Sequence, residues 1–377
     1  MKLKSLLFLS VLSASAPLVA FALPVTGVTF KTSDAALQKI YNSAVSNAAV
    51  NVIQFTPTMK ILVEGGGFRN CWLETQPMGG EMYAKRNVEV ALNNQVIFIQ
   101  TRRADGRVAA SLVTEKVAVE KGRDKEHTPE GFVWLTNMNM LAVFQSFQGY
   151  NFPDSAWKMY FWAGKDRTYL QQLYDTLEGH DNYLWRTRDS NGDGILETWC
   201  IYDTGEDHNM RLMMRGVPTR WPFEKPPGSP GTGDPKNLAE RKRYWSEHFK
   251  DNVPAPTTLA EVLAPIASMD IMAYSYGGRI TLAKISRELG NGREKFWQQK
   301  AEEVRQHVIK GLWDEKRQAC FDHDRNGKQM PEITHNNIRC MWHGMFTQEM
   351  ADGFIREHMA QSGRTLVAAA AAVQRHS

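Results

Sequence analysis

Acidic and amide residues are concentrated in one stretch of the chain, RDSNGDGILETWCIYDTGEDHNMR at residues 188–211. Within it, Asp189, Asn191 and Asp193 alternate with other residues, and Gly194 follows them. A calcium loop takes side-chain oxygens from its first, third and fifth positions and a backbone carbonyl from its seventh, and it turns at a glycine in its sixth. The sequence therefore predicts a structural Ca²⁺ site formed by Asp189, Asn191, Asp193, Ile195 and Glu197.

The end of this loop departs from the EF-hand pattern. The twelfth position, which should hold a bidentate glutamate, is Cys200, and Glu197 at the ninth position is the nearest substitute. A polar turn of the Asx type is the alternative interpretation, because D-x-N-G-D-G also favours such a turn.

Three more carboxylates follow, Asp203, Glu206 and Asp207, and Arg211 comes four residues after Asp207. Hydrolysis of a glycosidic bond needs one protonated carboxylic acid beside the leaving oxygen and a second carboxylate that activates water or attacks carbon. Clustered acids on a loop suit that chemistry, although a solvated surface role is the alternative for any one of them.

Tryptophans support the carbohydrate interpretation. The chain has 11 of them, and we expect Trp72, Trp134, Trp199 and Trp221 to lie in or beside loops. Aromatic faces pack against the apolar faces of sugar rings, and acids beside them bind the hydroxyls.

The elements that must position these residues are mostly helices, because apolar residues recur at 3–4 spacing along most of the chain. Strands are hard to find. The predicted helices cover residues 34–49, 80–101, 131–148, 154–163, 166–186, 236–249, 266–289, 292–312 and 344–359. At 313–329, short apolar pieces flank Asp-Arg-Asn-Gly, which predicts a β-hairpin turn. The pattern predicts an all-α fold with long loops, of which 188–235 is the longest.

Residues 1–22 have the pattern of a cleavable signal peptide, with two lysines, an apolar run and a final Ala20-Phe21-Ala22. No later stretch approaches the roughly 18 apolar residues of a membrane helix, so we expect a secreted or periplasmic protein. A net charge of +4 without a dense basic block argues against nucleic acid as a partner. Two states are open for Cys71, Cys200, Cys320 and Cys340: one or two disulfides, or small buried thiols.

The quoted stretch also resembles a known family. The run from Trp185 to Glu197, followed by GEDHNMR at 205–211, is similar to the W-x-x-x-R-D-x-[DN]-x-[DN]-G-L-x-E…G-x-D-[ND]-S-x-R segment of glycoside hydrolase family 63 and its mannosylglycerate-hydrolase-like relatives. FRNCWLET at 68–75 resembles the first active-site loop of that family, and QTRRADGRV at 100–108 resembles a helix exit. The resemblance spans about residues 60–360.

What the resemblance implies is an (α/α)6 barrel of the six-hairpin type over residues 23–360 and inverting hydrolysis of an α-linked glucoside or mannoside. Asp207 would be the general acid and 189–197 the calcium loop. The expected substrate-binding residues are Arg69, Trp72, Trp134, Glu206, Arg211 and Trp221. We expect a monomer that binds an oligosaccharide or glycoside.

Two departures from the family pattern matter. His208 and Asn209 stand where the motif has [ND]-S. The catalytic base of the family lies in a later aromatic-rich loop that this sequence lacks, and residues 361–377 form an atypical alanine-rich tail. We therefore expect a barrel that is incomplete at its C-terminal end, with Glu332 as an in-chain candidate for the base.

Two other functions remain open from the sequence. One is a non-catalytic carbohydrate-binding protein or inactive fragment. The other is an α/α-barrel polysaccharide lyase, for which Tyr202 and His208 would be the best residues.

Overall fold

The computed structural model describes residues 28–360, apart from residues 66, 124, 126, 127, 129, 130, 208, 214, 216 and 228–262. The signal peptide predicted at 1–22, the helix predicted at 236–249 and the tail predicted at 361–377 therefore lie outside the described residues.

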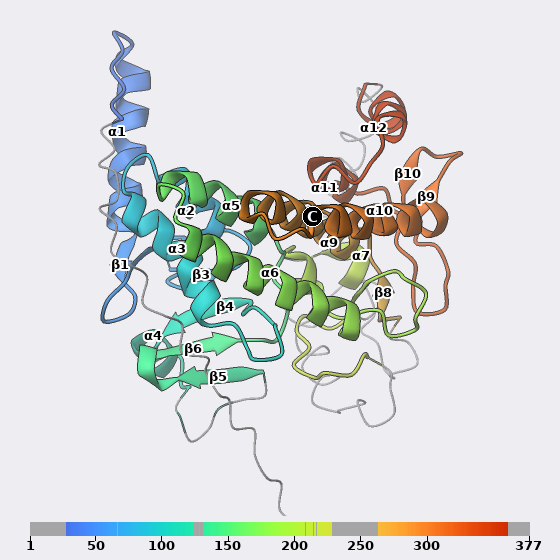
Figure 1. Ribbon diagram of the computed structural model, residues 1–377, viewed down its shortest axis with the longest axis horizontal. Coiled ribbons are helices and arrows are strands. Elements are labelled where there is room, and N and C mark those ends of the chain that lie inside the picture. The colour runs from blue at the N-terminus through green and yellow to red at the C-terminus, as the bar shows by residue number, and fades with distance from the viewer. Residues whose placement is uncertain are drawn as a thin grey trace, which may run out of the picture.

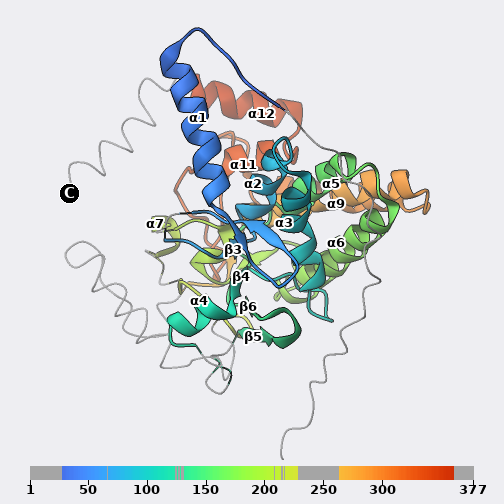
Figure 2. The same cartoon turned by 90° about the vertical axis from the view of Figure 1, so that its left-hand side faces the viewer.

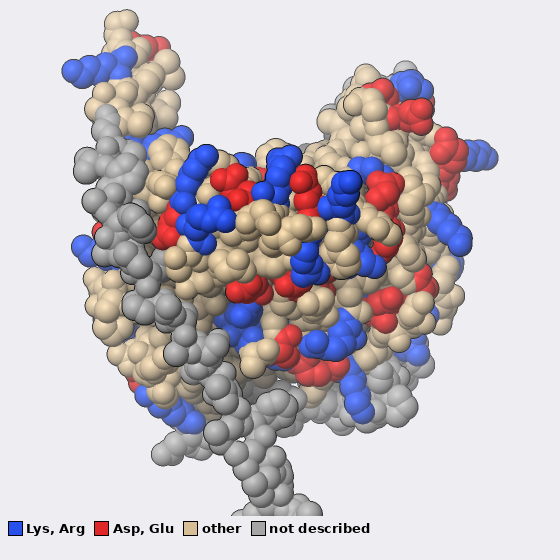
Figure 3. Space-filling view, in the orientation of Figure 1, with Lys and Arg blue, Asp and Glu red and all other residues tan. Residues whose placement is uncertain are grey.

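Pairs of helices joined by short loops make up most of the molecule. They are α2 (Gln76–Tyr83) with α3 (Val88–Gln100), α5 (Phe152–Trp162) with α6 (Arg167–Thr187), and α9 (Met269–Leu289) with α10 (Glu294–Gly311). Helix α9 packs against both α6 and α10. The pair α5–α6 and the pair α9–α10 therefore lie next to each other across the middle of Figure 1. On the face shown in Figure 3, acidic and basic side chains are interspersed, as expected for solvated helix faces.

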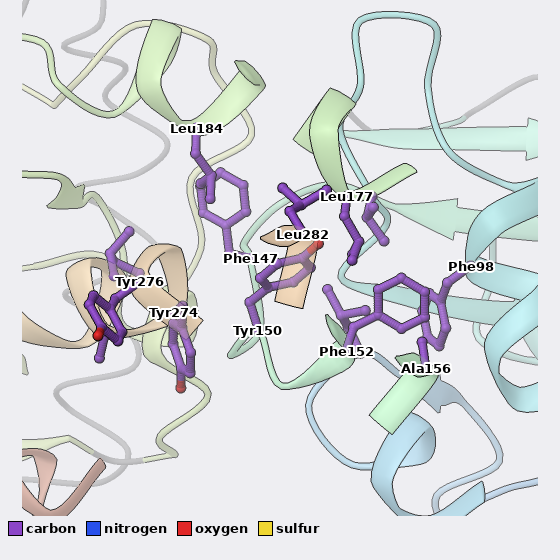
Figure 4. Close-up of a cluster of buried hydrophobic side chains, with 14 of the residues drawn as sticks. Phe98, Phe147, Tyr150, Phe152, Ala156, Leu177, Leu184, Tyr274, Tyr276 and Leu282 are labelled. Atoms are coloured by element: carbon purple, nitrogen blue, oxygen red, sulfur yellow. The ribbon is translucent and has the colours of Figure 1, made fainter. Parts of the chain in front are cut away.

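The apolar faces of these helices form the core as their spacing predicts. Leu170, Leu173, Leu177 and Leu184 of α6 are buried. On α10 the buried residues are Trp297, Ala301, Val304 and Val308. Asp166 caps α6, since its Oδ1 accepts a hydrogen bond from the Thr168 amide at 2.8 Å. Figure 4 shows the aromatic side chains that fill the space between the helices, with Phe98, Phe147, Tyr150 and Phe152 at its centre.

A four-stranded antiparallel sheet lies beside the helices, in the order β3-β4-β6-β5 (Figure 1). Its strands are β3 (Cys71–Trp72), β4 (Ser111–Thr114), β5 (Phe132–Leu135) and β6 (Met140–Val143). The helix predicted at 131–148 is therefore wrong. The apolar residues of this segment fit both the spacing of a helix and that of a strand. A 3₁₀ turn at Thr136–Met138, followed by Asn139 at φ +52°, separates two strands there.

The helix predicted at 80–101 is two helices. The first, α2, ends at Tyr83, and Asn87 begins α3, because its side chain accepts a hydrogen bond from the Val90 amide at 3.0 Å. Asparagine is a favoured N-cap residue, since its short side chain satisfies an amide of the first helical turn.

Smaller elements complete the described chain. The hairpin predicted at 313–329 is confirmed: β9 (Trp313–Asp314) pairs with β10 (Ala319–Cys320), and His323 pairs with Gln329 around Asp324–Gly327. Helix α1 (Ala35–Val50) forms as predicted, yet Leu37 and Ile40 are 51% and 65% exposed. The other elements are β1 (Val52–Gln54), β2 (Lys60–Leu62), α4 (Glu115–Glu120), β7 (Glu197–Thr198), the 3₁₀ helix η2 (Ile201–Thr204), α7 (Met210–Met213), β8 (Ile266–Ala267), α11 (Asn336–Trp342), α12 (Gln348–Phe354) and a π-helical turn (Ile355–Met359). The last two form the helix predicted at 344–359. Both α1 and α12 project beyond the layer of paired helices, at opposite ends of it in Figure 1, and they overlap only in the turned view of Figure 2.

All four cysteines are buried free thiols, which confirms the second of the two states left open by the sequence. In the part of the chain that the structure describes, no helix has the length and apolarity to cross a bilayer.

A buried ion pair joins α6 to the loops that carry the acids. Asp203 is fully buried, and its carboxylate accepts hydrogen bonds from Arg188 Nη1 at 2.7 Å and from the amides of Phe147 at 2.9 Å and Trp199 at 2.8 Å. The Arg188 guanidinium also lies over the Trp199 ring, with its central carbon 4.0 Å from the ring centroid. One carboxylate thus fixes the end of α6, the segment after β7 and the loop at 147.

Replacing Asp203 with alanine should destabilise the protein by about 3–5 kcal/mol, because it leaves the Arg188 charge buried without its partner. Urea denaturation measures the loss. Asp154→Ala is the matched control, since it breaks an exposed pair with Lys158 and should cost at most about 1 kcal/mol. Equal losses for the two variants would contradict this account of Asp203.

Candidate active site

Asp207 lies at the surface in the turn after η2, where it lines a cavity of about 420 Å³. We call this cavity the Asp207 cleft. Its walls come from four parts of the chain: residues between 64 and 75 around β3, residues 110 and 111 at the start of β4, residues between 121 and 148 around β5 and β6, and residues between 202 and 220. Loops from distant parts of the sequence therefore meet at one carboxylate.

Two further carboxylates, Glu64 and Glu74, line the same cleft. Gln148 holds Glu74 in place, since its Nε2 donates to Glu74 Oε2 at 2.9 Å. Burial, together with the negative charges of Asp207 and Glu64, raises the pKa of Glu74 from 4.5 to about 7. Burial and the charge of Asp207 also raise the pKa of Glu64. Asp207 is thus close enough to both glutamates for its charge to oppose their ionisation.

The cleft also contains aromatic and unpartnered polar groups. Phe68, Trp72 and Tyr202 lie in its wall. Three buried polar atoms of the lining, Asn70 Oδ1, Trp72 Nε1 and Ser111 Oγ, have no hydrogen-bond partner among the described residues. A buried polar atom without a partner costs about 1–3 kcal/mol. The aromatic side chains of the wall offer surface for the apolar face of a sugar ring.

Glu206 and Arg211 belong to a buried network behind the cleft. Asn336 Nδ2 donates to Glu206 Oε1 at 2.6 Å and to Asp270 Oδ2 at 2.8 Å, and Arg211 Nη2 donates to the same Asp270 oxygen at 2.7 Å. Burial alone would raise the pKa of Glu206, but the hydrogen bond from His335 and the charges of Arg211 and Arg339 outweigh it and lower the pKa to about 2. The side chains of Glu206 and Arg211 therefore make their polar contacts within the protein.

The other predicted substrate-binding residues are dispersed. Trp72 lines the cleft, whereas Arg69 is exposed and lines a different cavity beside β1. Trp134 lies on β5 and packs against Val113 and its neighbours. Trp221 is 2% exposed, and its Nε1 donates to the Lys225 carbonyl at 2.7 Å. The structure therefore places only Trp72 of this set beside Asp207.

Glu332, the in-chain candidate for the base, is paired elsewhere. Both of its oxygens accept hydrogen bonds from Arg215 Nη2, each at 2.9 Å. It is absent from the lining of the Asp207 cleft. His208 lies outside the described residues.

The predicted calcium loop turns as its pattern requires. Gly194 has φ +80°, Asp189 Oδ1 accepts from the Gly194 amide at 3.2 Å, and Asp193 Oδ1 accepts from the Ile195 amide at 2.8 Å. Glu197 is buried and turned to other partners: Ser190 Oγ donates to one oxygen at 2.7 Å and Trp199 Nε1 to the other at 2.8 Å. Within the described residues no three His, Cys, Asp or Glu side chains cluster as a metal site. The other predicted ligands of the loop are the Asn191 amide oxygen and the Ile195 carbonyl.

Sequence reasoning missed Glu64, Glu74 and Gln148. Glu74 stands within FRNCWLET, the segment that resembles the first active-site loop, so the resemblance could have identified it. Glu64 and Gln148 carry no local signal, because only the fold brings them to Asp207.

Comparison with known proteins gives one family and a group of similar folds. The family model for the mannosylglycerate hydrolase MGH1-like glycoside hydrolase domain matches residues 73–376. The structure of GH63 mannosylglycerate hydrolase from Thermus thermophilus in complex with glucose is 13% identical, with a TM-score of 0.59 over 86% of this chain and 76% of that chain. The same enzyme with Tris and D-glycerate gives 16% identity and a TM-score of 0.58 over 84% and 76%.

Neutral trehalase from Saccharomyces cerevisiae is 14% identical, with a TM-score of 0.50 over 84% of this chain and 61% of that chain. At such identities the likeness shows the fold, which is the (α/α)6 barrel expected from the sequence. No match is found among curated protein sequences.

The raised pKa of Glu74 predicts a pH dependence of stability. Because the folded pKa is about 7 and the ordinary value is 4.5, the folded protein binds the proton more tightly, and the free energy of unfolding should fall as pH rises between these values. Urea denaturation across this range should show a smaller fall for Glu74→Gln than for the unaltered chain. The exposed Glu315→Gln is the control, and identical slopes in all three proteins would contradict the assignment.

Proposed function

This chain belongs to the family of mannosylglycerate hydrolase MGH1-like glycoside hydrolase domains, and we propose that it is an exported enzyme that hydrolyses α-linked glucosides or mannosides with inversion. The observation that carries the proposal is the Asp207 cleft, which gathers three carboxyl groups and Trp72 around one cavity. That set has the groups that glycosidic bond cleavage requires.

Asp207 is the proposed general acid. It is exposed at the cleft, so the oxygen of a bound glycoside can approach it without a change in the fold. The buried pair of Asp203 with Arg188, which precedes it in the same segment, fixes the start of its loop. Asp207 would give its proton to the leaving oxygen as the bond to the sugar breaks.

Glu74 is the proposed general base. Inversion requires a carboxylate that takes a proton from the attacking water on the opposite face of the sugar. A base is most effective when its pKa lies near the working pH, and the pKa of Glu74 is about 7. Gln148 orients this carboxyl through one oxygen, whereas Glu332 is held by Arg215.

Calcium is the proposed structural ion of the 189–195 loop. Two carboxylates, the Asn191 amide oxygen and the Ile195 carbonyl form the hard-oxygen donor set that Ca²⁺ prefers. The loop adjoins β7 and the Asp203 pair, so a bound ion would stabilise the scaffold of the cleft and take no part in proton transfer. Export is proposed from the leader pattern at 1–22.

The role of Asp207 as acid and that of Glu74 as base can be distinguished with substrates whose leaving groups differ in their need for a proton. Asp207→Asn should lower kcat on an alkyl α-glycoside by about 10²–10⁴-fold yet retain most activity on the α-glycosyl fluoride, because fluoride leaves without protonation. Glu74→Gln should lose activity on both substrates. Released sugar is measured with Glu315→Gln as control.

Full activity of Asp207→Asn on the alkyl glycoside would contradict its role. Saturable binding of the glycoside by the unaltered chain without any release of sugar would instead favour a carbohydrate-binding protein.

Removal of calcium should lower the melting temperature. An ion present at 100 times its Kd stabilises a folded protein by about 2.7 kcal/mol. Calorimetry with CaCl₂ and then with EDTA should show this shift for the unaltered chain and a much smaller one for Asp193→Asn. Mg²⁺ at the same concentration is the control, and equal melting temperatures with CaCl₂ and EDTA would remove calcium from the account.

A further inference from the structure

The backbone carbonyl of Thr204 is held by two helices. Thr204 is the last residue of η2, it is completely buried, and it precedes Asp207 by three residues. Its carbonyl accepts a hydrogen bond from the Tyr274 hydroxyl of α9 at 3.1 Å and another from Arg339 Nη1 of α11 at 2.9 Å. Both helices therefore hold the backbone at the point where the loop of the proposed acid begins.

The two donors are themselves fixed by their surroundings. Tyr274 is 2% exposed, and the Arg339 guanidinium carbon lies 5.6 Å from the centroid of its ring. Arg339 Nη1 also donates to Asp270 Oδ1 at 3.1 Å, and that carboxylate is completely buried. Groups whose rotamers are fixed by packing and by further hydrogen bonds can hold a neighbour in one position. The Thr204 carbonyl is such a neighbour.

Beyond Thr204 the chain touches the segment that holds Glu74. Gly205 has φ +73°, and a side-chain carbon added to it would lie 3.2 Å from the Gly149 Cα and 3.2 Å from Glu74 Oε2. The Gly149 amide donates to the Asp203 carbonyl at 3.1 Å. The two backbones are thus in direct contact, and glycine allows this close approach.

These contacts connect the proposed acid to the proposed base. Gln148 donates its backbone amide to the Tyr202 carbonyl at 2.9 Å and its Nε2 to Glu74 Oε2 at 2.9 Å. Glu74 is therefore attached to the same backbone from which Asp207 extends. In an inverting glycosidase the two carboxyl groups lie on opposite sides of the reacting carbon, and a misplacement of about 1 Å can lower the rate about 10²-fold. The path of the chain into Asp207 therefore affects the rate.

We propose that Tyr274 is a positioning residue of the active site: together with Arg339 it holds the Thr204 carbonyl and thereby places Asp207 beside the glycosidic oxygen. This inference rests on the proposed glycosidase function and assigns a role within it to a side chain outside the cleft. Tyr274 is not among the described residues that line the Asp207 cleft, so its hydroxyl acts through the backbone of residues 204–207.

The test is Tyr274→Phe in the full chain, which removes the hydroxyl and keeps the ring. The kcat on an alkyl α-glycoside should fall at least about tenfold with little change in KM, because the acid is displaced from the leaving oxygen. Activity on the α-glycosyl fluoride should change less than about twofold, since fluoride leaves without a proton from Asp207 and Glu74 keeps its contact with Gln148. Equal losses on both substrates would mean a general structural role and overturn the proposal.

Tyr276→Phe is the matched control. Tyr276 lies on the same helix, is 6% exposed, and its hydroxyl accepts a hydrogen bond from Arg305 of α10. Figure 4 shows both tyrosines on α9. The control therefore removes a similar hydroxyl without touching Thr204, and it should leave the ratio of the activities on the two substrates unchanged.

Amide hydrogen exchange tests the same contact without any turnover. The Asp203 and Gly205 amides donate within η2, to the Cys200 carbonyl at 3.1 Å and the Tyr202 carbonyl at 3.3 Å. Loss of one hydrogen bond to this segment should make both amides exchange at least about fivefold faster in Tyr274→Phe and leave them unchanged in Tyr276→Phe. Faster exchange in a chain that cleaves no glycoside would overturn the proposed catalysis but support the contact. Unchanged exchange in Tyr274→Phe would overturn the role assigned to its hydroxyl.

Discussion

The carboxylate of Asp203 is the contact on which the site depends. It is completely buried, and it accepts hydrogen bonds from the Arg188 guanidinium and from the backbone amides of Phe147, Trp199 and Cys200. A buried charge is tolerated only when its hydrogen bonds are satisfied in good geometry, so the segments that supply those donors have little freedom to move. They include the end of α6, the loop at 147–149 and the 3₁₀ helix η2 that leads to Asp207. The loop that carries the proposed general acid is therefore positioned by an interaction that takes no part in the proposed reaction.

The ionic groups of the protein divide according to their partners. Arg211, Asp270, Asn336 and Glu206 contact one another in a buried network, and Arg188 pairs with Asp203. In the Asp207 cleft, burial and the charges of neighbouring acids raise the pKa of Glu74 and of Glu64, and burial and the charge of Arg220 lower the pKa of Arg123. Charged groups that are paired within the protein hold its segments together. Like charges that lie near one another around a cavity instead have shifted pKa values, which is typical of functional sites.

The sequence was most informative where physical signals are local. The 3–4 spacing predicted α5, α6, α9 and α10, and Asp-Arg-Asn-Gly predicted its hairpin turn. The sheet was missed because Phe132–Leu135 and Met140–Val143 are apolar runs too short to distinguish a strand from a helix. Aromatic content likewise could not separate Trp72, which lines the cleft, from Trp221, which is buried.

Site residues, too, could be predicted only where the signal is local in the sequence. Asp207 stood within a specific motif, whereas Glu64, Gln148, Arg123 and Arg220 reach the cleft only through the packing of segments far apart in the chain. Glu206 shows the converse: it is adjacent to Asp207 along the chain, yet its Oε1 contacts Asn336 and His335 and it does not line the cleft.

The most direct test of the central claim, that the Asp207 cleft is where a glycoside is bound and cleaved, is a crystal structure of the Asp207→Asn chain soaked with an α-glycoside. The account predicts a sugar ring against Trp72, its glycosidic oxygen beside residue 207 and its reacting carbon on the side of Glu74. A glycoside bound instead in the cavity between α2, α5 and α9, which Tyr150 and His343 line, would contradict it.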